Sequence, residues 1–496
     1  MKADFHKYNK PNIKKIFYKV NKFYGVDRVS PDDTLSLGYA KYLCNLNVFN
    51  GRISKCFGVG DAIINGIAVP SGVLLGKLVK NADVYRKQNN SSSLQNDSVV
   101  LLLSDNKVYE AEVGVSKTLK DTGITVADLR VNFLNYYKDG KDWLLVFDGS
   151  GVMHKYDGNT TTKVSDIPIF GTVCVHKGRI YGGTLTEENK LKYSATLKPE
   201  EWNKDTTDAG EIEFPDEGGA IRKLIECGNE LFIIRDYSVY KLSAYEDIAD
   251  YTLTKLFSGN RRIYPETVAN VDGKLVFLTE DGFYYYNGRA VEAIWKDLFP
   301  FIESAENGVA TGYGGKYYLS ARFVTEGNEY IGNEEYCNYN NGIMAVSPIT
   351  DEVSFLRGAD ISGFFRCNYG NKSYLLLRNS PGVKAMTIGM ITDDGKIYGE
   401  SVKKIWRSPK TPLDYIKEDK TVRKFYIKTN VPLTIKIMLD REYSYELPAS
   451  NKIQCVAVNG RAEDIEVKLE TLGDNPSISG FWLEIELTDR REYGGY

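Results

Sequence analysis

Histidine, the residue on which many catalytic and metal sites depend, is almost absent from this chain. Of 496 residues only three are histidine, His6, His154 and His176, and none has a second histidine or a cysteine at metal-ligand spacing. A Ser-His-Asp or Cys-His site would have to use His154 or His176, which fall in ordinary strand or turn segments. We therefore expect no catalytic residue, no metal ion, no cofactor, and a protein that is not an enzyme.

Cysteines are few and scattered, which argues against a disulfide framework or a zinc site. Their number is odd, and no two of them have CxxC spacing. This pattern is typical of reduced, mostly buried thiols. They are Cys44, Cys56, Cys174, Cys227, Cys337, Cys367 and Cys455.

The chain also lacks a long apolar run and a phosphate-binding glycine motif. Without an apolar run we expect no membrane span. The lysine-rich start does not have the layout of a signal peptide, so we expect assembly in a cytoplasm. Neither GxxxxGKS/T nor GxGxxG occurs between a strand and a helix, so nucleotide binding has no support.

Net charge is small, but its distribution is uneven. A formal charge of −3 excludes a bulk electrostatic nucleic-acid binder. Residues 1–22, however, carry seven lysines against one acid, Asp4. Such a segment could be a solvated terminus, or an arm that docks on a partner protein or on DNA phosphates, and both interpretations remain open. The candidate contact residues are Lys7, Lys10, Lys14, Lys15, Phe17, Tyr18 and Lys19.

Tyrosine and glycine are abundant, with 35 and 45 residues. Tyrosine favours strands and glycine favours tight turns, so many short strands are expected. A hairpin pattern recurs: a Gly or Asn turn, a short apolar strand, a polar turn and a strand that begins hydrophobic–Tyr. The first turns are Asp139–Lys141, Lys177–Arg179, Gly228–Glu230, Asp272–Lys274, Gly314–Lys316 and Gly370–Lys372.

This recurrence predicts a β-propeller. The turns repeat at a spacing of roughly 30–55 residues, which suits one blade of about four strands per period. Apolar runs such as Trp143–Phe147 and Leu275–Leu278 are typical of strands buried on both faces. We expect an irregular propeller of about six or seven blades over residues 60–400.

The C-terminal part has a different pattern. Residues 401–423 are charged and contain Pro409 and Pro412, as a linker would. After them, apolar and polar residues alternate strictly, which indicates antiparallel sheets with one packed face. The predicted fold class is all-β. The predicted domains are a basic arm and lead-in segment (1–59), a β-propeller (60–400), a linker (401–423) and a β-sandwich (424–496).

Three stretches share their turns and spacing with a known family. They are Phe23–Asp27 with Leu37–Ala40, Asn45–Ile53 and Phe57–Gly58; Leu191–Ser194 with Pro199 and Trp202; and Ile405–Pro409 ahead of Asn459–Arg461. Together they resemble bacteriophage virion proteins of the packaged-DNA stabilization or head-to-tail stopper type. The layout covers nearly the whole chain, whereas the basic arm at 1–22 has no counterpart in it.

The resemblance implies a structural virion protein of the neck or tail, in the head-to-tail connector or stopper region. Such a protein would form a homo-oligomeric ring and contact portal, adaptor or tail proteins. It would help retain packaged DNA and touch that DNA without sequence specificity. Its place would be the virion, after assembly in the host cytoplasm, with no membrane contact.

Two other functions remain open. A receptor- or carbohydrate-binding propeller at a tail tip would use exposed aromatic residues, although packing between blades is the favoured interpretation of the candidates. A propeller glycosidase would need paired carboxylates on the axis. The turns Thr279–Gly282 and Thr392–Gly395 approach the Ser/Thr-x-Asp-x-Gly-x-x-Trp pattern of sialidases, but each is one residue short and neither reaches a tryptophan. The aromatic candidates are Tyr284, Tyr285, Tyr286, Tyr317 and Tyr318.

Overall fold

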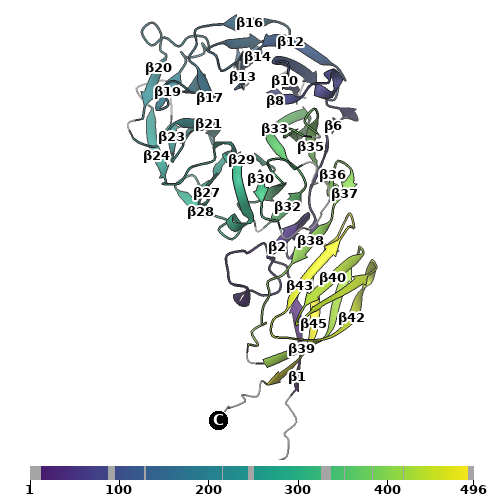
Figure 1. Cartoon of the computed structure of the whole chain (residues 1–496). Coiled ribbons are helices and arrows are strands. Elements are labelled where there is room, and N and C mark those ends of the chain that lie inside the picture. The colour runs from purple at the N-terminus through teal and green to yellow at the C-terminus, as the bar shows by residue number, and fades with distance from the viewer. Residues whose placement is uncertain are drawn as a thin grey trace, which may run out of the picture.

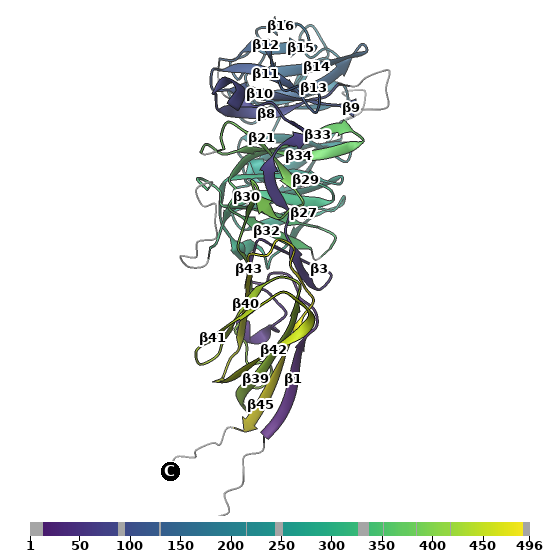
Figure 2. The same ribbon diagram turned by 90° about the vertical axis from the view of Figure 1, so that its right-hand side faces the viewer.

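Strands make up nearly all of the secondary structure, and they form two bodies joined end to end (Figures 1 and 2). The computed structural model describes residues 13–87, 95–127, 130–214, 216–243, 251–325, 337–350, 352–382, 384–416 and 418–489. A ring of sheets occupies one end of an elongated molecule and a β-sandwich the other. Within these residues, no helix is long and apolar enough to cross a membrane.

Five blades of the ring are four-stranded antiparallel sheets built from consecutive segments. The first contains β8 (Val79–Tyr85), β10 (Ser98–Leu103), β11 (Lys107–Glu112) and β12 (Leu119–Thr125). The second contains β13 (Asn132–Lys138), β14 (Lys141–Phe147), β15 (Met153–Tyr156) and β16 (Thr161–Val164), and the third β17 (Phe170–His176), β18 (Arg179–Thr184), β19 (Lys190–Tyr193) and β20 (Gly210–Glu213). The fourth contains β21 (Ile221–Cys227), β22 (Glu230–Arg235), β23 (Ser238–Ser243) and β24 (Thr252–Ser258), and the fifth β25 (Ala269–Val271), β26 (Lys274–Thr279), β27 (Gly282–Tyr286) and β28 (Val291–Ile294).

The last two blades also take strands from the N-terminal part of the chain. The sixth contains β29 (Ile302–Tyr313), β30 (Lys316–Phe323), β31 (Gly342–Val346) and β32 (Val353–Arg357), extended by β3 (Leu46–Phe49), β4 (Arg52–Lys55) and β44 (Ser477–Ile478). The seventh contains β33 (Ile361–Gly370), β34 (Lys372–Asn379) and β35 (Ile388–Thr392) with β5 (Gly58–Asp61) as its outer strand, plus β9 (Gln95–Asn96), β36 (Lys396–Ile397) and β37 (Glu400–Ser401). The described residues thus form seven blades, and the predicted all-β propeller with a β-sandwich is confirmed.

The ring closes where the seventh blade meets the first. Strand β33 packs beside β8. The guanidinium of Arg378 on β34 also reaches the first blade, where it donates to Lys80 O at 2.6 Å and to Asn81 Oδ1 at 2.9 Å. Strand β5 pairs with β35 over Gly58–Asp61. The N-terminal part of the chain therefore completes the final blade, which ties the two ends of the ring together.

Strand β10 shows why the inner strands are continuous apolar runs. All of its residues are buried. Leu101 and Leu103 pack toward the seventh blade, against residues such as Phe365. Val100 and Leu102 pack toward the second blade. Because each blade is covered on both faces by its neighbours, both sets of alternating side chains must be apolar.

The sandwich consists of two antiparallel sheets. One has the order β1 (Ile13–Val20), β45 (Phe481–Asp489), β39 (Glu418–Thr429), β42 (Ser450–Ala462). The other has the order β2 (Tyr42–Cys44), β38 (Lys404–Arg407), β43 (Glu466–Thr471), β40 (Leu433–Met438), β41 (Glu442–Leu447). The apolar residues of the alternating patterns, such as Ile435, Val467 and Ile485, face inward and are fully buried.

The domain boundaries in the structure differ from those expected from sequence. Residues 13–20, expected in a basic arm, form β1 of the sandwich, and residues 46–61 supply strands to two blades. Residues 401–423, expected as a linker, contain β38 and the first part of β39. The prolines Pro409 and Pro412 lie in the connection between these strands, where a missing N–H is tolerated.

One apolar core continues from the propeller into the sandwich. Asn45 separates β2 of the sandwich from β3 of the sixth blade, and its left-handed backbone (φ 57°) turns the chain between them. Its side chain holds both bodies, donating to Lys403 O at 2.7 Å and accepting from Arg357 N at 2.7 Å. Tyr42 packs edge-on against Phe301, with ring centroids 6.2 Å apart. The two bodies are therefore joined by packing as well as by the chain.

Candidate interaction site

The lysine-rich N-terminal segment is a paired strand in the structure. Lys7 and Lys10 lie outside the described residues, whereas Lys14, Lys15, Phe17, Tyr18 and Lys19 all lie in β1. Strand β1 pairs with β45 along its whole length, from Ile13 opposite Thr488 to Val20 opposite Phe481.

The two faces of β1 have different roles. Tyr18 is partly buried and packs against the sandwich core with Ile16 and Val20, so it lies on the inner side of β1. Lys15, Phe17 and Lys19 point to the opposite side, because side chains alternate along a strand. Phe17 is 60% exposed, which is unusual for a phenylalanine.

These residues belong to a larger surface, which we call the outer sheet face. It is the solvent side of the sheet β1-β45-β39-β42. Its strand register places Lys19 beside Trp482, Trp482 beside Tyr426, and Tyr426 beside Cys455. Its residues include Lys15, Phe17, Lys19, Arg423, Lys424, Tyr426, Ile453, Cys455, Trp482, Glu484 and Glu486.

Cations exceed carboxylates on the outer sheet face. Glu486 is paired with Lys15 at 3.3 Å and with Arg423 at 2.6 Å, and Arg423 above all holds the pKa of Glu486 below its usual value. Glu484 is paired with Lys424 at 3.6 Å. Lys19 has no carboxylate partner among the described residues. The face is thus a mixture of aromatic area and positive charge.

This arrangement is suited to protein–protein contact. Aromatic residues supply rigid contact area, and arginine and lysine select acidic partners. Strand β1 is also the edge of its sheet, so its outer backbone groups could accept a partner strand. Trp482, Tyr426 and Ile453 were not foreseen as site residues. The sequence does contain a sign of them: they stand at positions of the alternating strands that polar residues usually occupy, where tryptophan and isoleucine are unexpected.

A second exposed aromatic region lies in a cleft of about 760 Å³ between the sandwich and the propeller. Tyr24 stacks on Tyr39 with ring centroids 4.5 Å apart. Trp295 lies across the cleft with a left-handed backbone (φ 49°), which is rare for a bulky residue. Burial and the nearby Asp27 raise the pKa of the carboxyl of Asp297. The cleft is continuous with the junction core and is a further candidate contact region.

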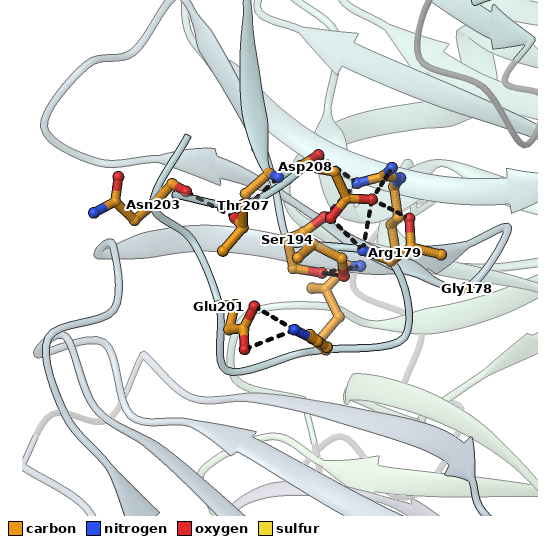
Figure 3. A network of polar contacts seen from close by, with 12 residues as sticks. Gly178, Arg179, Ser194, Glu201, Asn203, Thr207 and Asp208 are labelled. Atoms are coloured by element: carbon orange, nitrogen blue, oxygen red, sulfur yellow. Dashed lines mark hydrogen bonds and ion pairs between the residues drawn. The ribbon is translucent and has the colours of Figure 1, made fainter. Parts of the chain in front are cut away.

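A polar cavity of about 950 Å³ lies beside the third blade. A hydrogen-bond network fixes the loop over it (Figure 3). The buried guanidinium of Arg179 donates to Ser194 O at 2.9 Å and pairs with Asp208 at 2.8 Å. Lys198 and Glu201 form an ion pair at 3.0 Å. Trp202 also lines this cavity and packs on Phe170.

The tyrosines considered for a carbohydrate platform pack between blades. Tyr317 is fully buried and donates to Thr267 O at 2.7 Å. Tyr286 and Tyr318 are also buried. Tyr284 stacks on Phe277 at 5.6 Å, and Tyr285 is half-buried. The inter-blade packing interpretation fits these positions.

The described histidines and cysteines are not arranged for metal binding. His154 is buried, which lowers its pKa, and His176 lies 3.0 Å from Glu226. Among the residues that the structure describes, no group of three or more His, Cys, Asp or Glu could hold a metal ion. His6 lies outside these residues.

No protein-family model matches this chain, and no curated protein matches it significantly in sequence. Solved structures that it is similar to include Raptor from Chaetomium thermophilum, with a TM-score of 0.45 and 9% identity over 68% of this chain. That match spans 29% of the Raptor chain. BBS1N in complex with ARL6DN has a TM-score of 0.41 and 10% identity, covering 64% of this chain and 96% of that one. YCF48 from Cyanidioschyzon merolae has a TM-score of 0.38 and 10% identity, covering 64% and 95%. Similarity at this level says nothing about function.

Proposed function

We propose that this protein is a non-enzymatic structural component of a bacteriophage particle. It is placed at the neck or tail, in the head-to-tail connector or stopper region. Copies of the chain form a ring with portal, adaptor or tail proteins as neighbours, and the ring helps to retain packaged DNA. The propeller acts as a rigid scaffold, and the sandwich carries the outer sheet face to a neighbour.

The observation that carries the proposal is the rigid joint between the two bodies. Residues 13–61 pass through the sandwich, the sixth blade and the seventh blade in turn. A single apolar core spans the joint. A component of a pressurised particle must pass force between neighbours without bending. Such a joint supports that role, whereas domains connected by a flexible linker would move by default.

The outer sheet face supports an assembly role in a second way. An exposed phenylalanine and a partly buried tryptophan, with lysines beside both, suit an interface that is polar at its rim and aromatic at its centre. A ring requires a heterologous contact, in which one surface meets a different surface on the next subunit. The cleft around Trp295 is lined by two carboxylates, Asp27 and Asp297, and by one cation, Lys22, and this small excess of acid supports it as the surface that receives a basic aromatic face.

Electron microscopy of purified particles that carry the protein tests the placement. We expect antibody or tag labelling to mark the neck, with several copies around the axis. Label at the tail tip would favour receptor binding. Absence of the protein from the particle would contradict the whole proposal.

The outer sheet face can be tested separately with Phe17→Glu. We expect this substitution to reduce incorporation into particles by at least about tenfold, which corresponds to losing one hot-spot contact. Val115→Glu is the matched control, since Val115 is also 60% exposed but lies in the first blade, away from the sandwich. Equal incorporation of the two variants would exclude the face as an assembly contact.

The polar cavity beside the third blade favours a second candidate function, carbohydrate binding. Sugars are held by convergent polar groups next to an aromatic ring, and this cavity combines Trp202 with Lys192, Glu201 and Asn203. A glycan array is the test. Hits that are lost in Glu201→Gln would support this function, and an array without hits would rule it out.

A further inference from the structure

A cavity of about 490 Å³ lies on the propeller axis. Its wall comes from the innermost strands of the fourth, fifth, sixth and seventh blades and from the residue that follows β8 of the first. The wall is rigid where β25 and β29 meet. A side chain at Gly312 would collide with the carbonyl oxygen of Asn270, so the two backbones are in direct contact there.

The charged groups that line this cavity are mostly cations. They are Arg86, Lys223 and Arg366, with Asp272 as the carboxylate among the lining residues. Lys223 is paired with Glu266 at 2.8 Å. Arg86 and Arg366 form no ion pair with any residue that the structure describes. Arg86 interacts electrostatically with Asp83, whose pKa burial raises to about 6.

Arg366 is held in place without being neutralised. It donates from Nη2 to Gly312 O at 2.6 Å, and its guanidinium lies 5.7 Å from the Tyr313 ring. These contacts fix the side chain but leave its other donors without a protein acceptor in the described residues. On the adjacent strand, the Arg378 guanidinium donates to Ser362, Lys80 and Asn81 and interacts electrostatically with Glu266, so it is not available to a ligand in the cavity.

We propose that the axial cavity binds a phosphate group, which the guanidinium groups of Arg86 and Arg366 hold. A planar guanidinium matches two phosphate oxygens at once, and this bidentate geometry is stronger than a neutral hydrogen bond. A concave wall of low dielectric constant focuses the field of unpaired cations on a bound anion. The volume suits a small ligand, since such sites typically measure about 300–1,000 Å³. The phosphate belongs either to a free small molecule or to the end of a single nucleic-acid strand.

Calorimetric titration of the full chain with inorganic phosphate tests the proposal. We expect saturable binding that weakens at least tenfold in Arg366→Gln and in Arg86→Gln. Arg289→Gln is the matched control, because Arg289 is an exposed arginine in the turn before β28 and does not line the cavity. Arg86→Lys should retain part of the affinity for phosphate, because lysine keeps the positive charge but cannot form the bidentate contact of a guanidinium. Circular dichroism of each variant checks that it is folded.

Competition with a short single-stranded oligonucleotide separates the two sources of phosphate. Displacement of inorganic phosphate by the oligonucleotide, lost in Arg366→Gln, identifies a strand end. Phosphate binding without displacement identifies a free phosphate. The absence of saturable phosphate and oligonucleotide binding, or binding that neither arginine variant changes, would overturn the proposal. The measurement uses the isolated chain, so its outcome does not depend on the protein's place in a particle.

Discussion

The buried carboxylate of Glu110 has a hydrogen-bond partner across a blade boundary. Glu110 on β11 of the first blade is 1% exposed and accepts from the Tyr156 hydroxyl of the second blade at 2.6 Å. It also pairs with Lys87 at 2.5 Å. Burial alone would raise the pKa of Glu110, but the hydrogen bonds from Lys87 and Tyr156 outweigh it and hold the pKa below its usual value. The carboxylate is thus stabilised in its charged form.

Glu110→Gln should lower the free energy of unfolding by about 2 kcal/mol at pH 7, because hydrogen bonds to a charged group are lost inside the protein. Urea denaturation measures this. Glu112→Gln is the control, since Glu112 is half exposed and lies 4.0 Å from the same lysine; its effect should be near zero.

The pH dependence of this difference has a definite sign. A carboxyl whose pKa is lower in the folded state contributes stability that is present above its unfolded pKa. That stability is lost as the pH falls through the lowered folded value. The gap between wild type and Glu110→Gln should therefore close below about pH 4. A gap that stays constant down to acid pH would show that the charge of Glu110 is not its cause.

At the level of elements, the sequence predicts strands better than it predicts their partners. Runs such as Leu275–Leu278 and the strict alternation around Ile435 lie in strands of the structure, since burial on two faces or one dictates those patterns directly. Strand β5 has only four residues, and its partner β35 lies more than 300 positions further along the chain. No local pattern encodes such a pairing. Blade closure by the N-terminal part of the chain therefore could not be predicted.

The candidate site was predictable only in part, for the same reason. Phe17 and Lys19 could be identified because they stand in a lysine-rich stretch. That stretch also contains the alternation Ile16, Tyr18, Val20, which indicates a strand, but its lysines suggest a terminal arm, either solvated or docked on a partner. Trp482 becomes a neighbour of Lys19 only after β1 pairs with β45. The composition of a surface made by distant strands is a property of the fold.

Gly58 offers a test of ring closure by β5. A side chain at this position would come within 2.6 Å of the carbonyl oxygen of Lys396, which is backbone and cannot move aside. Gly58→Ala should therefore destabilise the protein by about 1–3 kcal/mol, as overpacking does. Limited proteolysis should show faster cleavage in the seventh blade.

Gly25→Ala is the control for that experiment. Gly25 also lies in the N-terminal part of the chain, but the nearest atom to an added Cβ is Val353 Cγ2 at 3.8 Å, an ordinary contact. This change should be neutral or slightly stabilising. If Gly58→Ala and Gly25→Ala had the same free energy of unfolding, the close packing of β5 would not be needed to close the ring.

At the scale of the whole molecule, the joint between propeller and sandwich decides whether the protein behaves as one body. Phe301 of the propeller contacts Phe323 and Phe355 of the sixth blade, with ring centroids 5.8 and 4.8 Å apart. Tyr42 of the sandwich adds its ring to this cluster. Aromatic contacts of this kind exclude water and resist shear, so the bodies should unfold together.

Tyr42→Ala should uncouple them. Tyr42 is 1% exposed, and removing a buried aromatic side chain typically costs about 3–5 kcal/mol. Because the lost contacts lie in the joint, we expect scanning calorimetry to show one transition for the wild type and two for the variant. Phe277→Ala, which empties an equally buried position between the fourth and fifth blades, should lower the stability by a similar amount and keep a single transition. Two transitions in the wild type, or the same behaviour in both variants, would mean that the joint does not couple the two bodies. The protein would then lack the rigid scaffold on which the proposed ring depends.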